Sequence, residues 1–294
     1  MSHLASDYEI TYLPVKKENI QDVEIIYGWS KELPKLEEMT SLKWIQSFSA
    51  GVNYFDLETL KDMGVILTSA SGIHGHQMTE SILGMLFSHT RKIKESILNQ
   101  EKHKWGVAGL GTDLLGKSVL IFGTGNIGTQ LAKVLDALGA DVYGVNRSGL
   151  EVDYFKGIYT YKEINHILPK ADIVVNLLPE TPETINYFDN ELFDSMKTGV
   201  MFINAGRGSA VKTETIIKQC QDEKLSFAGL DVFEEEPLPS DSPLWDLEQV
   251  LITPHISGPT DQYNNRLFEV FKQNIESYLN GEDMINAVNL DLGY

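Results

Sequence analysis

Cysteine is almost absent from this chain of 294 residues, which contains only Cys220. A single cysteine excludes an internal disulfide and any metal site built from several thiolates. Cys220 lies among apolar residues at helical spacing in the stretch 213–223, so we expect it to be a small packing residue.

Basic residues are also scarce, with 24 Lys and Arg against 42 Asp and Glu, for a formal net charge of −18. So acidic a surface argues against nucleic acid or an anionic membrane as the partner. A phosphate or carboxylate ligand would need a local cation here. Arg147 and Arg207 are the candidates that stand out.

Long hydrophobic runs are missing as well, since no stretch of about 18 apolar residues occurs, and we therefore expect no membrane span. The opening MSHLASDYEI lacks the basic and then apolar segments of a signal peptide. We expect a cytoplasmic protein, long enough to form two domains.

The strongest pattern that is present lies in 118–148. An apolar run at 119–122 leads into the turn Gly123-Thr-Gly-Asn-Ile-Gly128, then into a helical pattern, and then into a second strand at 142–145. This strand–turn–helix–strand context is the one that the GxGxxG fingerprint requires. The sequence therefore predicts a dinucleotide site, against the alternative of a glycine-rich turn without a ligand.

Each glycine of this turn has a physical reason. Gly123 permits the tight turn, Gly125 lets the backbone approach a pyrophosphate, and Gly128 lets the helix pack on the strand. The first helical turn, with Asn126 and Ile127, directs N–H groups at the phosphates. We assign all five residues to cofactor binding.

The end of the second strand indicates which cofactor is bound. NAD enzymes usually place Asp or Glu there to bond the ribose 2′-hydroxyl, whereas this chain has Asn146-Arg147-Ser148. Arg147 can pair with a 2′-phosphate and Ser148 can donate to it. We therefore predict that the protein prefers NADP(H) over NAD(H). The alternative is that Arg147 is a solvated loop residue and that both cofactors bind.

Strands and helices alternate along the rest of the chain, which predicts an α/β protein with mostly parallel sheets. The expected strands lie at 8–13, 23–27, 42–48, 65–67, 173–177, 200–204, 227–232 and 250–253. The expected helices lie at 31–41, 56–62, 77–91, 91–104, 161–168, 190–196, 213–223 and 262–280.

Three stretches, 200–208, 229–237 and 252–258, each include the carboxyl end of a predicted strand, at the sheet edge where α/β proteins bind ligands. With these motifs in view, the sequence resembles the D-isomer-specific 2-hydroxyacid dehydrogenases over nearly its whole length. The resemblance rests on GTGNIG, INAGRG, LDVFEEEPLP, SPLW and ITPH. Asn-Arg-Ser and the SPLW…ITPH run are most similar to the glyoxylate/hydroxypyruvate reductase branch.

The resemblance implies two α/β domains. Residues 89–262 would form a Rossmann domain with a doubly wound parallel sheet. Residues 1–88 and 263–294 would form a flavodoxin-like substrate domain. The family usually opens with a strand and a helix before the segment that matches 8–13, so the first sheet of this chain could lack a strand.

The implied reaction transfers hydride between a nicotinamide and a small 2-keto acid, giving the D-2-hydroxy acid. His255 would be the proton donor, since histidine exchanges protons near neutral pH. Arg207 would bind the carboxylate and carbonyl oxygens with its planar fork. Backbone N–H groups of Gly51 and Val52 would take the other carboxylate oxygen. Taken singly, His255 could instead be a capping residue and Arg207 a surface ion pair.

Three consecutive glutamates, Glu234, Glu235 and Glu236, compete to be the carboxylate beside the histidine. The resemblance favours Glu236, because it directly precedes Pro237. Asp231 would bond the nicotinamide carboxamide, although alone it could be a turn residue. The other residues implied in cofactor binding are Leu178, Pro179, Thr184, Ala205, Gly206, Ser257 and Gly258.

The resemblance also implies a homodimer in which Trp105 reaches the neighbouring subunit's active site; the alternative is an aromatic residue that closes a dimer surface. We expect no metal. The rival interpretations are a D-3-phosphoglycerate-type or other NAD-dependent dehydrogenase and a non-catalytic NAD(P)-sensing protein. Reduction of glyoxylate, hydroxypyruvate or pyruvate would discriminate among them.

Overall fold

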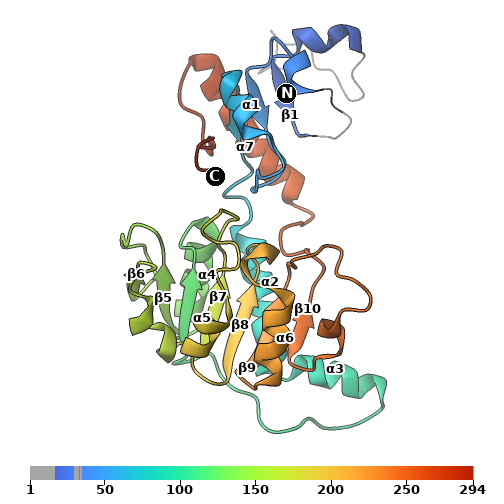
Figure 1. Ribbon diagram of the computed structural model, residues 1–294, viewed down its shortest axis with the longest axis vertical. Coiled ribbons are helices and arrows are strands. Elements are labelled where there is room, and N and C mark those ends of the chain that lie inside the picture. The colour runs from blue at the N-terminus through green and yellow to red at the C-terminus, as the bar shows by residue number, and fades with distance from the viewer. Residues whose placement is uncertain (1–16, 30–32, 34, 294) are drawn as a thin grey trace. The chain divides into compact units, whose positions relative to one another are not determined.

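The computed structural model describes residues 17–29, 33 and 35–293 (Figure 1). The chain divides into two compact units. One comprises Met1–Ile73 and Thr260–Tyr294, and the other comprises His74–Pro259. The strand predicted at 8–13 lies outside the described residues.

The unit His74–Pro259 is built on a seven-stranded sheet in which all neighbouring strands run parallel. The strands are β4 (Ser118–Phe122), β5 (Asp141–Val145), β6 (Gly157–Tyr159), β7 (Ile173–Asn176), β8 (Val200–Asn204), β9 (Leu225–Leu230) and β10 (Val250–Ile252). Their order is β10-β9-β8-β7-β4-β5-β6. The chain begins in the middle of the sheet, adds strands to one side and then crosses to the other. This order confirms the predicted Rossmann fold, whose ligand crevice lies where the direction reverses, between β4 and β7.

Helices cover both faces of this sheet (Figure 1). Successive side chains of β4 point to opposite faces. Val119 and Ile121 therefore belong to one core cluster, and Leu120 and Phe122 belong to another. The elements of this unit are α2 (Gly75–Thr90), α3 (Ile93–Glu101), α4 (Asn126–Ala137), α5 (Asn190–Ser195), α6 (Thr213–Gln221), and the 3₁₀ helices η3 (Ile164–His166), η4 (Leu168–Lys170), η5 (Gly208–Ala210) and η6 (Pro243–Asp246).

The boundaries between the units differ from the predicted ones at helix α2 and at residues 260–262, which group with the unit that contains α7 (Tyr263–Asn280). The sequence analysis assigned residues 1–88 to the substrate domain, whereas 74–88 group with the seven-stranded sheet. The reason is packing, because Ile82, Met85 and Leu86 of α2 are buried in the same cluster as α4 and the sheet.

The other unit has a three-stranded parallel sheet in the order β1-β2-β3. The central strand is buried along its length, and Trp44 stacks on Phe271 with ring centroids 5.3 Å apart. Near the end of the chain, the N–H of Val288 donates to the carbonyl of Leu67 at 2.8 Å. The elements are β1 (Ile25–Tyr27), β2 (Trp44–Gln46), β3 (Ile66–Thr68), α1 (Leu57–Asp62), α7 (Tyr263–Asn280), η1 (Lys17–Asp22) and η2 (Leu36–Glu38).

Two predicted helices were wrong in the part of the chain that the structure describes. Within 31–41 only the short η2 is helical, and residues 31, 32 and 34 lie outside the description. The helix predicted at 161–168 is replaced by η3 and η4. Its apolar residues are buried as expected, but so short a segment next to Pro169 gains few α-helical hydrogen bonds.

Candidate active site

The glycine turn between β4 and α4 has the geometry of a phosphate cradle. Gly123 has a φ of +99°, which side-chain-bearing residues rarely adopt, and a Cβ on Gly128 would collide with the carbonyl of Gly123. A Cβ on Gly125 would meet nothing within 4 Å. Gly125 is also the N-cap of the 12-residue helix α4, without a side-chain cap. The open space beside a helix N-terminus fits a dinucleotide pyrophosphate.

The turn after β5 and the loop after β7 follow the two strands that flank β4 in the sheet. Arg147 and Ser148 are exposed on the turn. The pKa of the Glu183 carboxyl lies below its usual value, because the carboxyl accepts hydrogen bonds from its own backbone and from Thr181, with a smaller effect from the charge of Arg147. The loop of Glu183 is closed by Thr184, whose hydroxyl donates to the carbonyl of Pro179 at 2.6 Å.

Two fully buried asparagines, Asn176 and Asn204, end the neighbouring strands β7 and β8. The amide of Asn176 donates to Oδ1 of Asn204 at 2.9 Å, and Nδ2 of Asn204 donates to the carbonyl of Arg207 at 3.2 Å. Leu178 N–H donates to Oδ1 of Asn176 at 3.0 Å. Neither asparagine was given a role from the sequence, although Asn204 ends one predicted strand and Asn176 is the last residue but one of another.

The segment Ala205–Gly206 continues this close packing. Ala205 is buried, and a Cβ on Gly206 would lie 2.8 Å from the carbonyl oxygen of Leu178. Only glycine therefore lets the loop after β8 approach the loop after β7. The close contact between the two loops fixes the backbone position of Arg207, which follows Gly206.

Arg207 lies at the N-cap of η5, and its Nη1 donates to the carbonyl of Gly206 at 2.8 Å. Burial lowers the pKa of its guanidinium, while the carboxylates of Glu180 and Glu236 oppose that shift. Arginine remains charged at any pH that proteins tolerate, and its fork has five N–H donors. A half-buried guanidinium of this kind can take a carboxylate in bidentate fashion.

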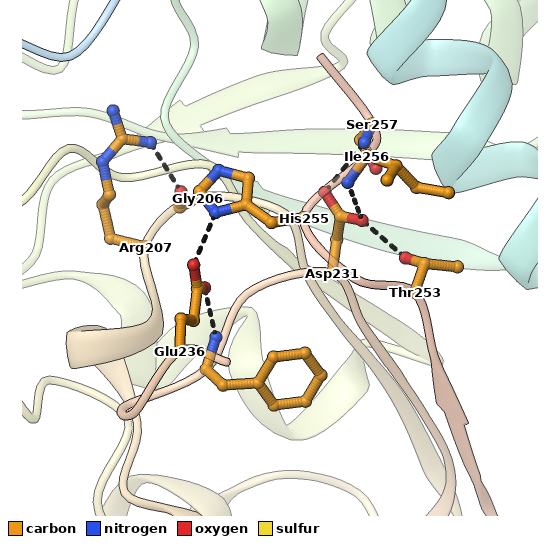
Figure 2. Close-up of polar contacts among 9 residues, drawn as sticks. Gly206, Arg207, Asp231, Glu236, Thr253, His255, Ile256 and Ser257 are labelled. Atoms are coloured by element: carbon orange, nitrogen blue, oxygen red, sulfur yellow. Dashed lines mark hydrogen bonds and ion pairs between the residues drawn. The ribbon is translucent and has the colours of Figure 1, made fainter. Parts of the chain in front are cut away.

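His255 and Glu236 form a hydrogen-bonded pair (Figure 2). Nδ1 of His255 lies 2.8 Å from Oε2 of Glu236, and Oε1 of the same carboxylate accepts the N–H of Phe233 at 2.9 Å. Glu234 instead accepts the N–H of Thr213 at the start of α6. Of these glutamates, the structure thus pairs Glu236 with the histidine.

The loop that carries His255 is fastened by Asp231, which follows β9 and is buried (Figure 2). Its carboxylate accepts the hydroxyl of Thr253 at 2.5 Å and the N–H groups of Ile256 and Ser257 at 3.0 Å each. The N–H of His255 donates to the Asp231 carbonyl at 2.8 Å. These bonds hold His255 at a φ of +53°, a conformation that is costly for residues other than glycine.

The Asp231 carboxylate thus already accepts hydrogen bonds from three donors of the protein. Its predicted bond to the nicotinamide carboxamide stays a prediction. Thr253, one of those donors, was missed by the sequence analysis. The loop continues to Gly258, whose carbonyl accepts Nε2 of Gln77 at 3.1 Å.

Gly51 and Val52, whose backbone N–H groups are predicted to donate to the substrate carboxylate, belong to the unit Met1–Ile73 and Thr260–Tyr294. The Val52 side chain is buried in that unit's core. The predicted contribution of their backbone N–H groups therefore stays a prediction.

Over residues 17–29, 33 and 35–293, no three His, Cys, Asp or Glu side chains are grouped so that they could hold a metal ion. Across that described part of the chain, every helix is too short or too polar to cross a membrane.

Residues 83–257 match the family model described as the D-isomer specific 2-hydroxyacid dehydrogenase, NAD binding domain. The chain is 31% identical over 262 residues to the glyoxylate/hydroxypyruvate reductase B of Enterobacter sp. (strain 638). That alignment covers 86% of this chain and 80% of the relative. The chain spans about half (53%) of two curated D-3-phosphoglycerate dehydrogenases, from Methanocaldococcus jannaschii and Mycobacterium leprae.

Two solved structures share the fold. A phosphoglycerate dehydrogenase from Lactobacillus plantarum is 36% identical, with a TM-score of 0.64 and coverage of 94% of this chain and 90% of that one. An NADPH-dependent glyoxylate/hydroxypyruvate reductase from Sinorhizobium meliloti, in complex with NADP and sulfate, is 27% identical. Its TM-score is 0.81, with coverage of 95% and 90%.

Proposed function

The chain belongs to the D-isomer-specific 2-hydroxyacid dehydrogenase family, and on that premise we propose that it reduces small 2-keto acids of the glyoxylate/hydroxypyruvate type to D-2-hydroxy acids with NADPH. The observation that carries the proposal is the His255–Glu236 pair, which shares the carboxyl edge of the parallel sheet with Arg207. This edge is where α/β proteins of this topology bind their ligands.

Each side chain of the site has a distinct task. The nicotinamide supplies the hydride when it is bound. Arg207 holds the carboxylate of the keto acid and draws charge onto the carbonyl oxygen. His255 donates a proton from Nε2 to that oxygen as the negative charge develops. Glu236 accepts the hydrogen bond from Nδ1 and so fixes the ring orientation and the tautomer.

Glu236→Gln should lower kcat/KM for keto acid reduction by about 10²-fold, a typical effect of weakening general acid catalysis. The amide has one acceptor oxygen where the carboxylate has two, so it cannot accept from both Phe233 and His255 at the places where the two carboxylate oxygens do. The matched control is Glu234→Gln, whose carboxylate caps α6 instead of contacting the histidine. Equal losses in the two variants would contradict the role given to Glu236.

The preference for NADPH is supported by the exposed Arg147 and Ser148 and by the absence of a carboxylate at the end of β5. The Sinorhizobium meliloti relative is an NADPH-dependent enzyme. At this turn a guanidinium favours a 2′-phosphate over a 2′-hydroxyl because of its charge.

Arg147→Ala should raise KM for NADPH by at least about tenfold, since a charge-assisted contact to the phosphate is lost. KM for NADH should change by less than about threefold, because that ribose carries no phosphate for the side chain to bind. Arg147→Lys keeps the positive charge but not the planar guanidinium, so its KM for NADPH should lie between those of the wild type and Arg147→Ala. A parallel rise for both cofactors would contradict the assignment.

The direct test of the proposed function is a panel of 2-keto acids assayed with each reduced nicotinamide, followed by chiral analysis of the product. We expect turnover of glyoxylate and hydroxypyruvate, with NADPH preferred and D-glycerate formed from hydroxypyruvate. Binding of NADPH without turnover would favour a non-catalytic sensing protein. Formation of the L-isomer would contradict the proposal.

A second candidate is a D-3-phosphoglycerate-type dehydrogenase. The Lactobacillus plantarum phosphoglycerate dehydrogenase, at 36% identity, supports it. Including phosphohydroxypyruvate in the panel decides between the two. A kcat/KM above that for hydroxypyruvate would favour the phosphorylated substrate.

The proposal extends to a homodimer. The Trp105 side chain is fully exposed, and Leu110 is 91% exposed on the segment between α3 and β4. Large apolar side chains gathered in one exposed segment are typical of a surface that another chain covers. A second copy of this chain is the partner that the family resemblance favours.

A further inference from the structure

Asn146 occupies the position directly after β5 where NAD enzymes usually carry a carboxylate. Both the oxygen and the nitrogen of its side-chain amide form hydrogen bonds within the protein. Oδ1 accepts the N–H of Gly149 at 2.6 Å and the hydroxyl of Ser148 at 3.3 Å. Nδ2 donates to the carbonyl of Leu150 at 3.2 Å and to the hydroxyl of Thr124 at 3.0 Å.

These four bonds use the whole capacity of the amide, which has two donors and an acceptor oxygen with two lone pairs. Asn146 therefore has no hydrogen-bonding group left for a ribose hydroxyl. Three of the bonds close the turn 146–150 on itself, and this turn carries Arg147 and Ser148.

The fourth bond links this turn to the glycine turn. Thr124 lies between Gly123 and Gly125, and its methyl group packs over β5, where a Cβ on Gly144 would lie 2.5 Å away. The Thr124 hydroxyl accepts the amide of Asn146. A single side chain thus fastens the turn that would face the ribose to the turn that would hold the pyrophosphate.

We propose that Asn146 is a positioning residue for cofactor selection, which holds Arg147 and Ser148 in register with the glycine turn through Thr124. The inference rests on the proposed preference for NADPH. It adds that the preference depends on the geometry of the turn as well as on the charge of Arg147, and that a residue without any contact to the phosphate controls it.

The matched pair Thr124→Val and Thr124→Ser tests the link. Valine has nearly the shape of threonine but no hydroxyl, whereas serine keeps the acceptor for the Asn146 amide. We expect Kd for NADPH, measured by titration of the cofactor's fluorescence, to rise about fivefold in Thr124→Val, the usual effect of one lost hydrogen bond. Kd for NADH should stay within about twofold in both variants, and Thr124→Ser should resemble the wild type.

Asn146→Asp tests the amide itself. The carboxylate cannot donate to Leu150 and places a negative charge beside the expected phosphate, so the ratio of NADH to NADPH dissociation constants should fall by about 10²-fold. Thermal unfolding of each variant checks that it is folded.

The outcomes separate the two proposals. If the wild type prefers NADPH while Thr124→Val and Asn146→Asp keep its cofactor ratio, the inference falls and the proposed function stands. Equal weakening of NADPH and NADH in Thr124→Val would show a purely structural role and would also overturn it. If the wild type itself binds NADH at least as tightly as NADPH, the cofactor preference fails and the inference falls with it.

Discussion

Replacement of His255 by alanine should lower kcat/KM for 2-keto acid reduction by about 10³-fold, within the usual range for loss of a general acid. The alkoxide that forms at C2 would then have to take its proton from water. The histidine side chain is about half exposed and its imidazole is hydrogen-bonded to Glu236, so the fold should survive the change. Steady-state kinetics and thermal unfolding measure the two effects separately.

The control for this variant is His166→Ala, which removes an exposed histidine of η3 in the same unit. It should leave kcat/KM within about twofold of the wild type, as is usual for a surface change away from the site. Kd for NADPH should be retained in His255→Ala. A His255→Ala enzyme that keeps more than a tenth of the wild-type rate would show that another group donates the proton.

Arg207→Ala should also lower kcat/KM by about 10³-fold, because the guanidinium is expected to hold the keto acid and to stabilise the charge that develops on its oxygen. Arg207→Lys should recover only part of the rate, since an ammonium cannot reproduce the bidentate fork. Added guanidinium ion should partly restore the alanine variant. Kinetics with and without that ion measure the rescue.

Arg91→Ala provides the matched control. Arg91 belongs to the same unit, but it is exposed and pairs with Asp113 at 3.1 Å on the surface. This variant should be nearly unchanged and should not respond to guanidinium. If Arg207→Ala instead raised only the KM for NADPH, Arg207 would belong to the cofactor site, and its assignment to the substrate would be wrong.

The parts of the fold that could be predicted depend on local physics. A β-branched run such as 119–122 forms a strand, and Gly123 has the positive φ that a tight turn requires. The parallel sheet then brings the ends of 200–208, 229–237 and 252–258 to one edge, because each stretch includes the carboxyl end of a strand of that sheet. The family and the two-domain α/β fold were confirmed.

Hydrogen bonds between residues far apart in the chain could not be predicted in this way. The bond between Asn176 and Asn204 depends on the register of β7 against β8, which no local pattern specifies. For the same reason the sequence indicated that Asp231 lies near the cofactor but not that it fastens the loop of His255. The Asn146–Thr124 bond is a third example, since 22 positions separate the partners.

Short elements were the other source of error. Strand β6 was not predicted; its three residues are all only partly buried, so apolar burial does not mark it. In the segment 161–168, spacing alone predicted a helix, but η3 and η4 bury the same apolar residues in tighter turns. Burial was thus easier to predict than backbone conformation, because apolar spacing reports burial directly.

The most direct test of the account follows deuterium from NADPH labelled at the transferable C4 position to hydroxypyruvate. If the site acts as proposed, the product is D-glycerate with one deuterium at C2, formed at the rate of NADPH consumption and about 10³-fold more slowly by His255→Ala. A product without deuterium, a labelled L-isomer, or equal rates in the two proteins would contradict it.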